Sequence, residues 1–125
     1  MIRLLFALLP MLAIAAPAQG QPAAVPTVTI VETNFHIEPG VIHLVANRPV
    51  RLVFSNRSGS RHDFSAPDFF ASARGSGEPG RRGTVEVPVN GEAVVTLVPA
   101  RGSYRAKCTH FGHRMMGMSA TIIVD

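Results

Sequence analysis

The chain has 125 residues, 46% of them hydrophobic, and its 12 Lys and Arg against 8 Asp and Glu give a net charge of +4 at pH 7. This length supports one ordinary domain, and because aromatic residues are not interleaved with the scattered basic ones, the charge argues against a nucleic-acid partner. The single cysteine excludes an intrachain disulfide as well as metal sites built from several thiolates.

The N-terminal segment has the composition of an export signal. A positive start from Met1 to Arg3 precedes an apolar run from Leu4 to Ala16, and Ala16-Pro17-Ala18 offers the small residues that a signal peptidase requires. The apolar run is shorter than the about 20 residues of a spanning helix. We therefore expect residues 1–18 to be a signal peptide, cleaved after Ala18, and the mature protein to lie in the periplasm without stable membrane insertion.

After a flexible leader expected at residues 19–26, the chain becomes a series of short β-branched runs separated by turn signals. In one run, the apolar residues Val50, Leu52 and Phe54 alternate with their neighbours, which is the period of a half-buried strand. The pattern predicts an all-β domain over residues 27–125, an antiparallel sandwich or barrel. The predicted strands are Thr27–Glu32, Val41–Val45, Val50–Ser55, Thr84–Val89, Ala93–Val98, Tyr104–Cys108 and Ala120–Val124.

Other segments carry weaker signals. One short helix is predicted at Pro67–Ala73, because proline is favoured at the first helical position. Residues 74–83 contain four glycines and a proline, which predicts a mobile loop. His36 and His43 are expected to be ordinary surface residues. Four apolar residues are expected in the core: Phe35, Ile37, Phe54 and Phe64.

The segment from Cys108 to Met118 is dense in soft metal ligands, with the sequence Cys-Thr-His-Phe-Gly-His-Arg-Met-Met-Gly-Met. Thiolate, imidazole and a weak thioether form the ligand set that suits copper, whereas zinc and iron–sulfur sites usually use several thiolates. In an exported chain an odd thiol stays free, pairs with another molecule or binds a metal. The neighbouring ligands favour the metal.

The predicted strands also position these ligands. Tyr104, Ala106 and Cys108 share one face of a strand, so the thiol lies at the strand end, and the following loop can fold its histidine and methionine back onto the same metal. A further imidazole is needed from elsewhere in the chain. His62 is the candidate, because it closes a polar segment directly after a core strand and has the apolar Phe64 beside it.

With these features the sequence resembles the cupredoxins, the single-domain blue copper proteins such as plastocyanin, azurin and pseudoazurin. The resemblance covers residues 27–125 and rests on a histidine after a strand that ends in Asn, and on a Cys-x4-His-x4-Met motif before the last strand. It is most similar to small exported bacterial members with a His-Asp-Phe-Ser-Ala-Pro segment before a short Phe-rich helix. The resemblance implies a Greek-key β-sandwich and one copper per chain, with His62, Cys108 and His113 as equatorial ligands and Met118 as the weak axial ligand.

The sequence departs from the family at the residue after His62. Asp63 stands where the family usually has Asn, whose side chain ties the histidine segment to the ligand loop. A carboxylate beside the copper adds negative charge and would lower the reduction potential. Whether Asp63 bonds to the backbone or to the side chain of Thr109 is open from the sequence.

The ligand segment also carries three extra soft donors, His110, Met115 and Met116, to which the family pattern assigns no task. Met115 and Met116 are alternatives to Met118 at the axial position. His110 is an alternative to His113, because it lies two residues from Cys108 on an extended segment. The Gly-His and Gly-Met pairs of the motif favour the longer spacing.

Three strong ligands and a weak axial sulfur suit both Cu(I) and Cu(II), so little rearrangement accompanies the change of charge. We therefore expect a monomer that carries single electrons between redox partner proteins. The alternative is a copper carrier or chaperone that hands Cu(I) to copper-handling proteins, for which the extra donors would supply exchange ligands. We expect no enzyme and no catalytic residues, because the sequence has no nucleophile elbow or glycine-rich phosphate loop, and its metal motif leaves no open coordination position.

Overall fold

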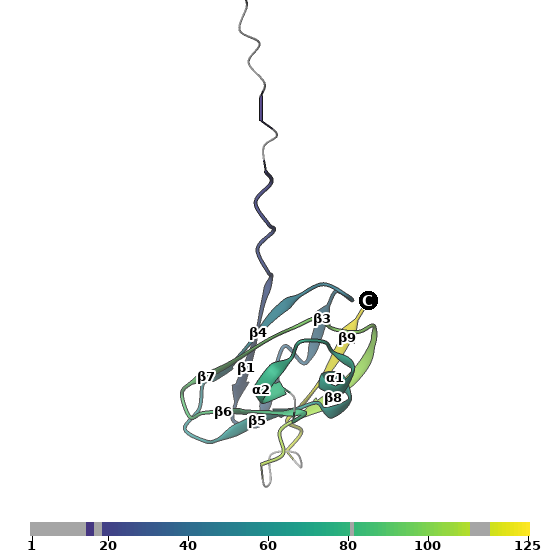
Figure 1. Cartoon of the computed structure of the whole chain (residues 1–125). Helices are drawn as coiled ribbons and strands as arrows, with labels where there is room; N and C mark the ends of the chain where they lie inside the picture. The colour runs from purple at the N-terminus through teal and green to yellow at the C-terminus, as the bar shows by residue number, and fades with distance from the viewer. Residues whose placement is uncertain (1–14, 17–18, 81, 111–115) are drawn as a thin grey trace, which may run out of the picture.

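The computed structural model describes residues 15–16, 19–80, 82–110 and 116–125, and it shows a β-sandwich (Figure 1). Residues 19–26 are exposed, lie in no helix or strand, and extend away from the sandwich. The strands are β1 (Thr27–Thr33), β2 (His36–Glu38), β3 (Val41–Leu44), β4 (Val50–Asn56), β5 (His62–Ser65), β6 (Thr84–Val87), β7 (Glu92–Leu97), β8 (Gly102–Lys107) and β9 (Ser119–Val124).

Two sheets make up the sandwich. One has the order β2-β1-β4-β7, and the other has the order β3-β9-β8-β5-β6. Both sheets are mixed, because β1 pairs in parallel with β4, and β3 pairs in parallel with β9. The predicted all-β sandwich is confirmed, and the structure adds these two parallel pairs, which the spacing of strands along a sequence does not reveal.

All seven predicted strands are present, and their ends differ from the predicted ones by at most two residues. Two further strands, β2 and β5, were not predicted. The three-residue β2 is too short to show a period. In β5 all four side chains are buried, including the polar His62, Asp63 and Ser65, so the alternation that marks a half-buried strand is missing.

The predicted helix is confirmed as α1 (Pro67–Ser72), with proline in its first turn. The segment predicted as a loop at residues 74–83 contains a helical turn, α2 (Gly77–Gly80), and Arg74 forms a bridge with Val98. The glycine-rich composition therefore did not predict the short helix α2.

The core between the sheets contains three of the four expected side chains. Ile37, Phe54 and Phe64 are buried, and the rings of Phe54 and Phe64 lie 4.7 Å apart. The prediction for Phe35 is wrong, because its side chain is 38% exposed. Phe35 lies in the turn between β1 and β2 with a φ of 69°, and this turn directs the side chain to the surface. Apolar character alone does not show that a residue lies in a turn.

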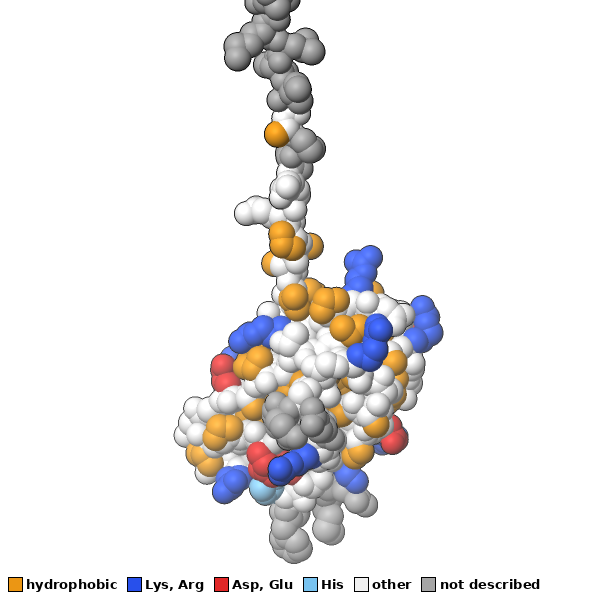
Figure 2. All heavy atoms as spheres, viewed as in Figure 1, with side chains coloured by type: hydrophobic (Ala, Val, Ile, Leu, Met, Phe, Trp, Pro, Cys, Tyr) orange, Lys and Arg blue, Asp and Glu red, His pale blue; other side chains and the backbone are white. Residues whose placement is uncertain are grey.

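The surface bears out two further expectations. Lys and Arg side chains are spread over the visible face rather than gathered in one patch (Figure 2). His36 and His43 are exposed, as predicted. Within the described part of the chain, the helices are too short and too polar to cross a bilayer.

Candidate metal centre

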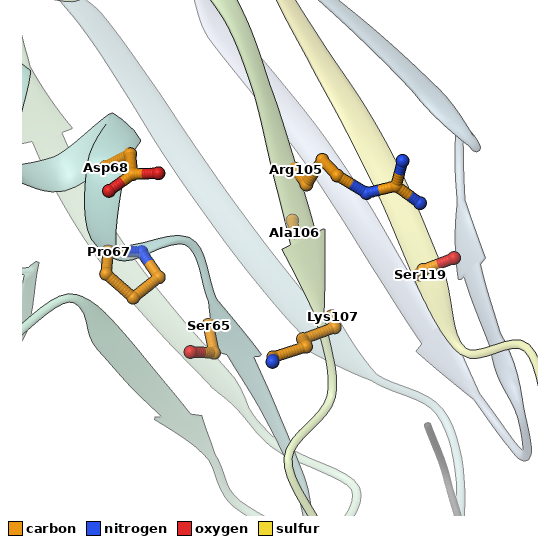
Figure 3. A pocket seen from close by; sticks show the side chains of 7 residues that line it. All are labelled: Ser65, Pro67, Asp68, Arg105, Ala106, Lys107 and Ser119. Carbon is orange, nitrogen blue, oxygen red and sulfur yellow. The ribbon is translucent and has the colours of Figure 1, made fainter. Parts of the chain in front are cut away.

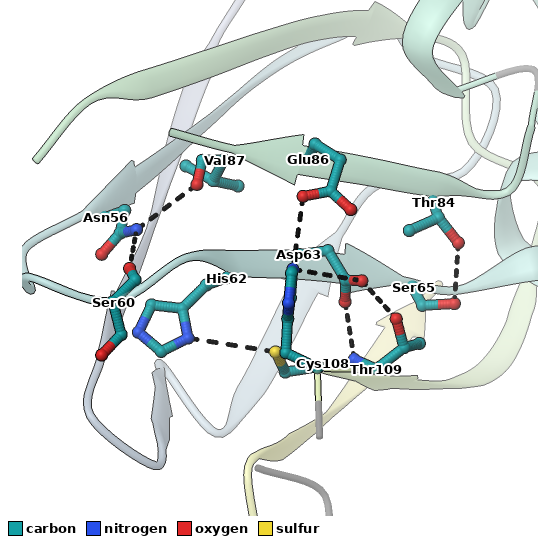
Figure 4. A network of polar contacts seen from close by, with 11 residues as sticks. Asn56, Ser60, His62, Asp63, Ser65, Thr84, Glu86, Val87, Cys108 and Thr109 are labelled. Carbon is teal, nitrogen blue, oxygen red and sulfur yellow. Dashed lines mark hydrogen bonds and ion pairs between the residues drawn. The ribbon is translucent and has the colours of Figure 1, made fainter. Parts of the chain in front are cut away.

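His62 and Cys108 come together inside the second sheet, although they are far apart in the sequence. His62 begins β5, and Cys108 follows the last residue of the neighbouring strand β8. Both side chains are fully buried, and the Cys108 Sγ lies 3.9 Å from the His62 Nδ1 (Figure 4). The pairing of β5 with β8 thus brings a thiol and an imidazole to one point. Their role as metal ligands stays a prediction.

The distance between these two donor atoms fits a shared metal ion. Bonds from a metal to thiolate sulfur and imidazole nitrogen are about 2.3 Å and about 2.1 Å long. Two such bonds at a wide angle place the donors roughly 3.5–4 Å apart, so the observed separation requires no rearrangement of β5 or β8. A thiol and an imidazole in a dry pocket suit copper.

Met118 is the third buried donor at this end of the core. Its side chain is fully buried, and its carbonyl oxygen accepts a hydrogen bond of 3.1 Å from the Cys108 backbone N–H. Met116 is 62% exposed, which argues against it as an axial ligand. The structure therefore brings together His62, Cys108 and Met118, whereas His113 and Met115 lie outside the described residues and the equatorial role of His113 stays a prediction.

The second nitrogen of His62 is held by a polar network. Its Nε2 lies 2.8 Å from the hydroxyl of Ser58, which in turn donates to the Asn56 Oδ1 at 2.9 Å. Asn56 also donates from its Nδ2 to the carbonyl oxygen of Ser60 at 2.8 Å and so closes the turn after β4. When Nδ1 binds a metal, Nε2 carries the ring proton, and Ser58 is placed to accept it.

Asp63, the unusual neighbour of His62, bonds to both the backbone and the side chain of Thr109. The Thr109 backbone N–H donates to Oδ1 at 2.7 Å, and the Thr109 hydroxyl donates to Oδ2 (Figure 4). The question that the sequence left open is thus answered in favour of both groups. These bonds tie the strand that carries His62 to the residue that follows Cys108.

Burial raises the pKa of the Cys108 thiol above its ordinary value, and the backbone N–H groups of Asp63 and His110 partly oppose this effect. The negative charges of Asp63 and Glu32 raise the thiol pKa further. Without a bound cation the pocket therefore favours the neutral thiol. A metal ion must compensate this preference when it binds the thiolate.

Sequence reasoning missed Glu32, which points into the core from β1. Its side chain is fully buried, and neither carboxyl oxygen has a hydrogen-bond partner among the described residues. Burial, followed by the negative charges of Asp63 and Glu86, raises the pKa of Glu32 from 4.5 to about 8. Sequence alternation could have identified this position, because Val28, Ile30 and Glu32 share one side of the strand.

A cavity of about 480 Å³ lies apart from the buried His62 and Cys108 side chains, neither of which lines it (Figure 3). It lies beside α1 and β8, and its lining includes Asp68, Arg105 and Lys107. Because successive side chains of a strand alternate, Lys107 and Cys108 point to opposite sides. Among the described residues that line this cavity there is no Cys, His or Met.

Comparisons with known proteins agree with this fold. A family model described as a cupredoxin-like domain matches residues 4–124. No curated protein matches the chain in sequence.

Three similar solved structures share the architecture. Reduced auracyanin from the photosynthetic bacterium Roseiflexus castenholzii is 19% identical, with a TM-score of 0.62 over 82% of this chain and 99% of that protein. Auracyanin B is 21% identical, with a TM-score of 0.60 over 85% and 93% of the two chains. The apo form of a copper binding protein is 21% identical, with a TM-score of 0.59 over the same shares.

Proposed function

Because this chain belongs to the cupredoxin-like family, we propose that it is a periplasmic type 1 copper protein that carries single electrons between redox partner proteins. The observation that carries the proposal is the 3.9 Å approach of the Cys108 Sγ to the His62 Nδ1 in a fully buried pocket that also contains Met118. Copper is the cofactor that this donor set fits, and it supplies one-electron chemistry by alternating between Cu(I) and Cu(II).

The residues around the pocket keep the ligands fixed while the charge changes. Ser58 holds the His62 ring through Nε2, and Asp63 holds the segment after Cys108 through Thr109. Ligands fixed by such neighbours move little between oxidation states, and this favours electron transfer. The proposed ligand set is His62, Cys108 and His113, with Met118 at the axial position.

A protein that moves electrons must keep its metal through repeated cycles. Voltammetry of the copper-loaded protein should therefore give a reversible one-electron wave, with one copper per chain retained after cycling. Copper that leaves the protein in the reduced state would contradict an electron carrier.

Copper transfer is the second candidate, and the 62% exposure of Met116 favours it, because an exchangeable Cu(I) needs accessible soft donors. The rate of Cu(I) loss to a chelator separates the two. A His110→Ala and Met116→Leu double variant should release copper at the parent rate if the protein carries electrons. A tenfold slowing, worth roughly 1.4 kcal/mol of barrier, would support copper transfer.

The periplasmic location rests on the signal peptide predicted at residues 1–18. Mass spectrometry of the protein from its native compartment should find a mature chain that begins at Gln19. An intact Met1 in a membrane fraction would contradict export with cleavage.

A further inference from the structure

A second group of metal-ligating side chains lies next to the copper pocket. It contains Asp63 of β5, Glu86 of β6 and His110, and one ligand atom from each residue lies within 4.8 Å of the others. The His110 Nε2 is 3.3 Å from the Glu86 Oε2 and 3.9 Å from the Asp63 Oδ2. The electron-transfer proposal assigns no task to Glu86 or His110.

The two carboxylates of this cluster are direct cross-strand neighbours. Asp63 lies opposite Glu86 in the antiparallel pairing of β5 with β6. Like charges in this position destabilise a sheet unless a positive charge lies between them. A divalent cation bound by Asp63, Glu86 and His110 would neutralise both carboxylates.

A separate observation comes from Glu32 in the other sheet. Its carboxyl group is fully buried, has no hydrogen-bond partner among the described residues, and carries a pKa that Asp63 and Glu86 help to raise. Burial is the first cause of this raised pKa, and the negative charges of Asp63 and Glu86 add to it. A bound cation would also relieve this repulsion.

Asp63 is already oriented for such a role. Both of its oxygens accept hydrogen bonds from Thr109, which fix the carboxylate plane. Each carboxylate oxygen has a second lone pair, so Asp63 keeps acceptor capacity on the side of His110. The Asp63 side chain is 3% exposed, whereas that of His110 is 30% and that of Glu86 is 56% exposed. One proposed ligand is therefore buried, and the other two are accessible to solvent.

We propose that Asp63, Glu86 and His110 form a second metal site that binds a divalent transition cation of the Zn²⁺ type. One imidazole and two carboxylates are borderline ligands that suit Zn²⁺, whereas Ca²⁺ and Mg²⁺ prefer oxygen ligands throughout. Three protein ligands leave room for water on the exposed side. A cation here would add positive charge beside the copper pocket and would thereby raise the reduction potential of the copper, because it disfavours Cu(II).

The test is a Zn²⁺ titration of the Cu(I)-loaded protein, with both metals counted by elemental analysis and zinc affinity measured by calorimetry. One zinc per chain should bind while copper is retained. Glu86→Gln and His110→Ala should each weaken zinc binding at least tenfold. Glu92→Gln in β7 and His43→Ala in β3 are matched controls on exposed residues, and they should leave the affinity unchanged.

Two further measurements keep this test independent of the copper pocket. Cys108→Ser removes the copper thiolate but should still bind one zinc. In NMR spectra of the Cu(I) protein, zinc should shift the ring signals of His110 and leave those of His43 in place. The proposal is overturned if zinc displaces copper, if no zinc is retained, or if neither Glu86→Gln nor His110→Ala weakens binding.

Discussion

Asp63 accepts two hydrogen bonds from Thr109, one from the backbone N–H at 2.7 Å and one from the hydroxyl. Asp63 follows His62 in β5, and Thr109 follows Cys108 in the segment after β8. A single carboxylate thus links the two segments that carry the metal donors. It also places a negative charge next to the proposed copper ligands.

Asp63→Asn should therefore raise the reduction potential and keep the copper. The amide oxygen can still accept the Thr109 N–H, whereas the charge that favours Cu(II) is lost. We expect a shift on the order of 1 kcal/mol, equivalent to tens of millivolts, in voltammetry of the loaded protein. Asp68→Asn on α1 is the control, because Asp68 is exposed. An unchanged or lowered potential in Asp63→Asn would show that the carboxylate does not act on the metal.

Ser58→Ala should weaken copper binding about 10-fold to 100-fold, because it removes the partner of the His62 Nε2. The hydroxyl also organises the turn after β4, so the free energy of unfolding should fall by about 1 kcal/mol. Competition with a chelator measures the affinity. Ser103→Ala, at an exposed position of β8, should change neither quantity. Equal copper affinities for Ser58→Ala and the parent would show that Ser58 does not support the copper ligand His62.

Glu32 should make the apo-protein less stable as the pH rises. Its pKa is raised in the folded state from 4.5 to about 8, so between these values the folded protein holds a proton that the unfolded chain has lost. The stabilisation by this proton is complete below pH 4.5 and is lost as the pH rises through about 8. The free energy of unfolding should fall by on the order of 4 kcal/mol over this range. Denaturant unfolding at a series of pH values measures this.

Glu32→Gln is the matched variant, since glutamine has a similar shape and does not titrate here. It should flatten the decline in stability and be more stable than the parent above pH 8. If the parent and Glu32→Gln lose stability in parallel over this range, the decline comes from other groups.

Met118→Leu should keep copper bound and raise the reduction potential, because loss of the sulfur donor destabilises Cu(II) more than Cu(I). Met116→Leu should have little effect, since Met116 is 62% exposed while Met118 is fully buried. Voltammetry of both variants decides between them. A larger shift of the reduction potential in Met116→Leu than in Met118→Leu would indicate that Met116 is the axial ligand.

The sequence pattern predicted the strands whose residues alternate between core and solvent. It did not predict elements whose burial does not alternate. All four residues of β5 are buried, so the strand that carries His62 showed no alternation. Phe35 illustrates the opposite failure, since its positive φ in a turn exposes an apolar ring. Both exceptions depend on contacts or backbone geometry that local pattern does not encode.

Ligand chemistry selected Cys108 and Met118 in the motif, and His62 outside it, as candidate ligands, because few residue types bind copper. The structure buries all three side chains, and their role as copper ligands stays a prediction. The supporting residues were harder to find. The role of Ser58 could not be predicted, because it depends on the turn after β4, which brings the Ser58 hydroxyl to the His62 Nε2. Glu86 lies beside Asp63 only because β5 pairs with β6, and these two residues are 23 positions apart (86 − 63) in the sequence.

The visible spectrum of the mature protein with Cu(II) tests the central claim most directly, because a thiolate bound to Cu(II) gives an intense charge-transfer band. We predict a strong blue or green colour that saturates at one copper per chain, is abolished in Cys108→Ser and is severely weakened in His62→Ala and His113→Ala. A colourless protein that binds one zinc per chain in copper-replete cells would contradict the assignment of a copper centre at Cys108.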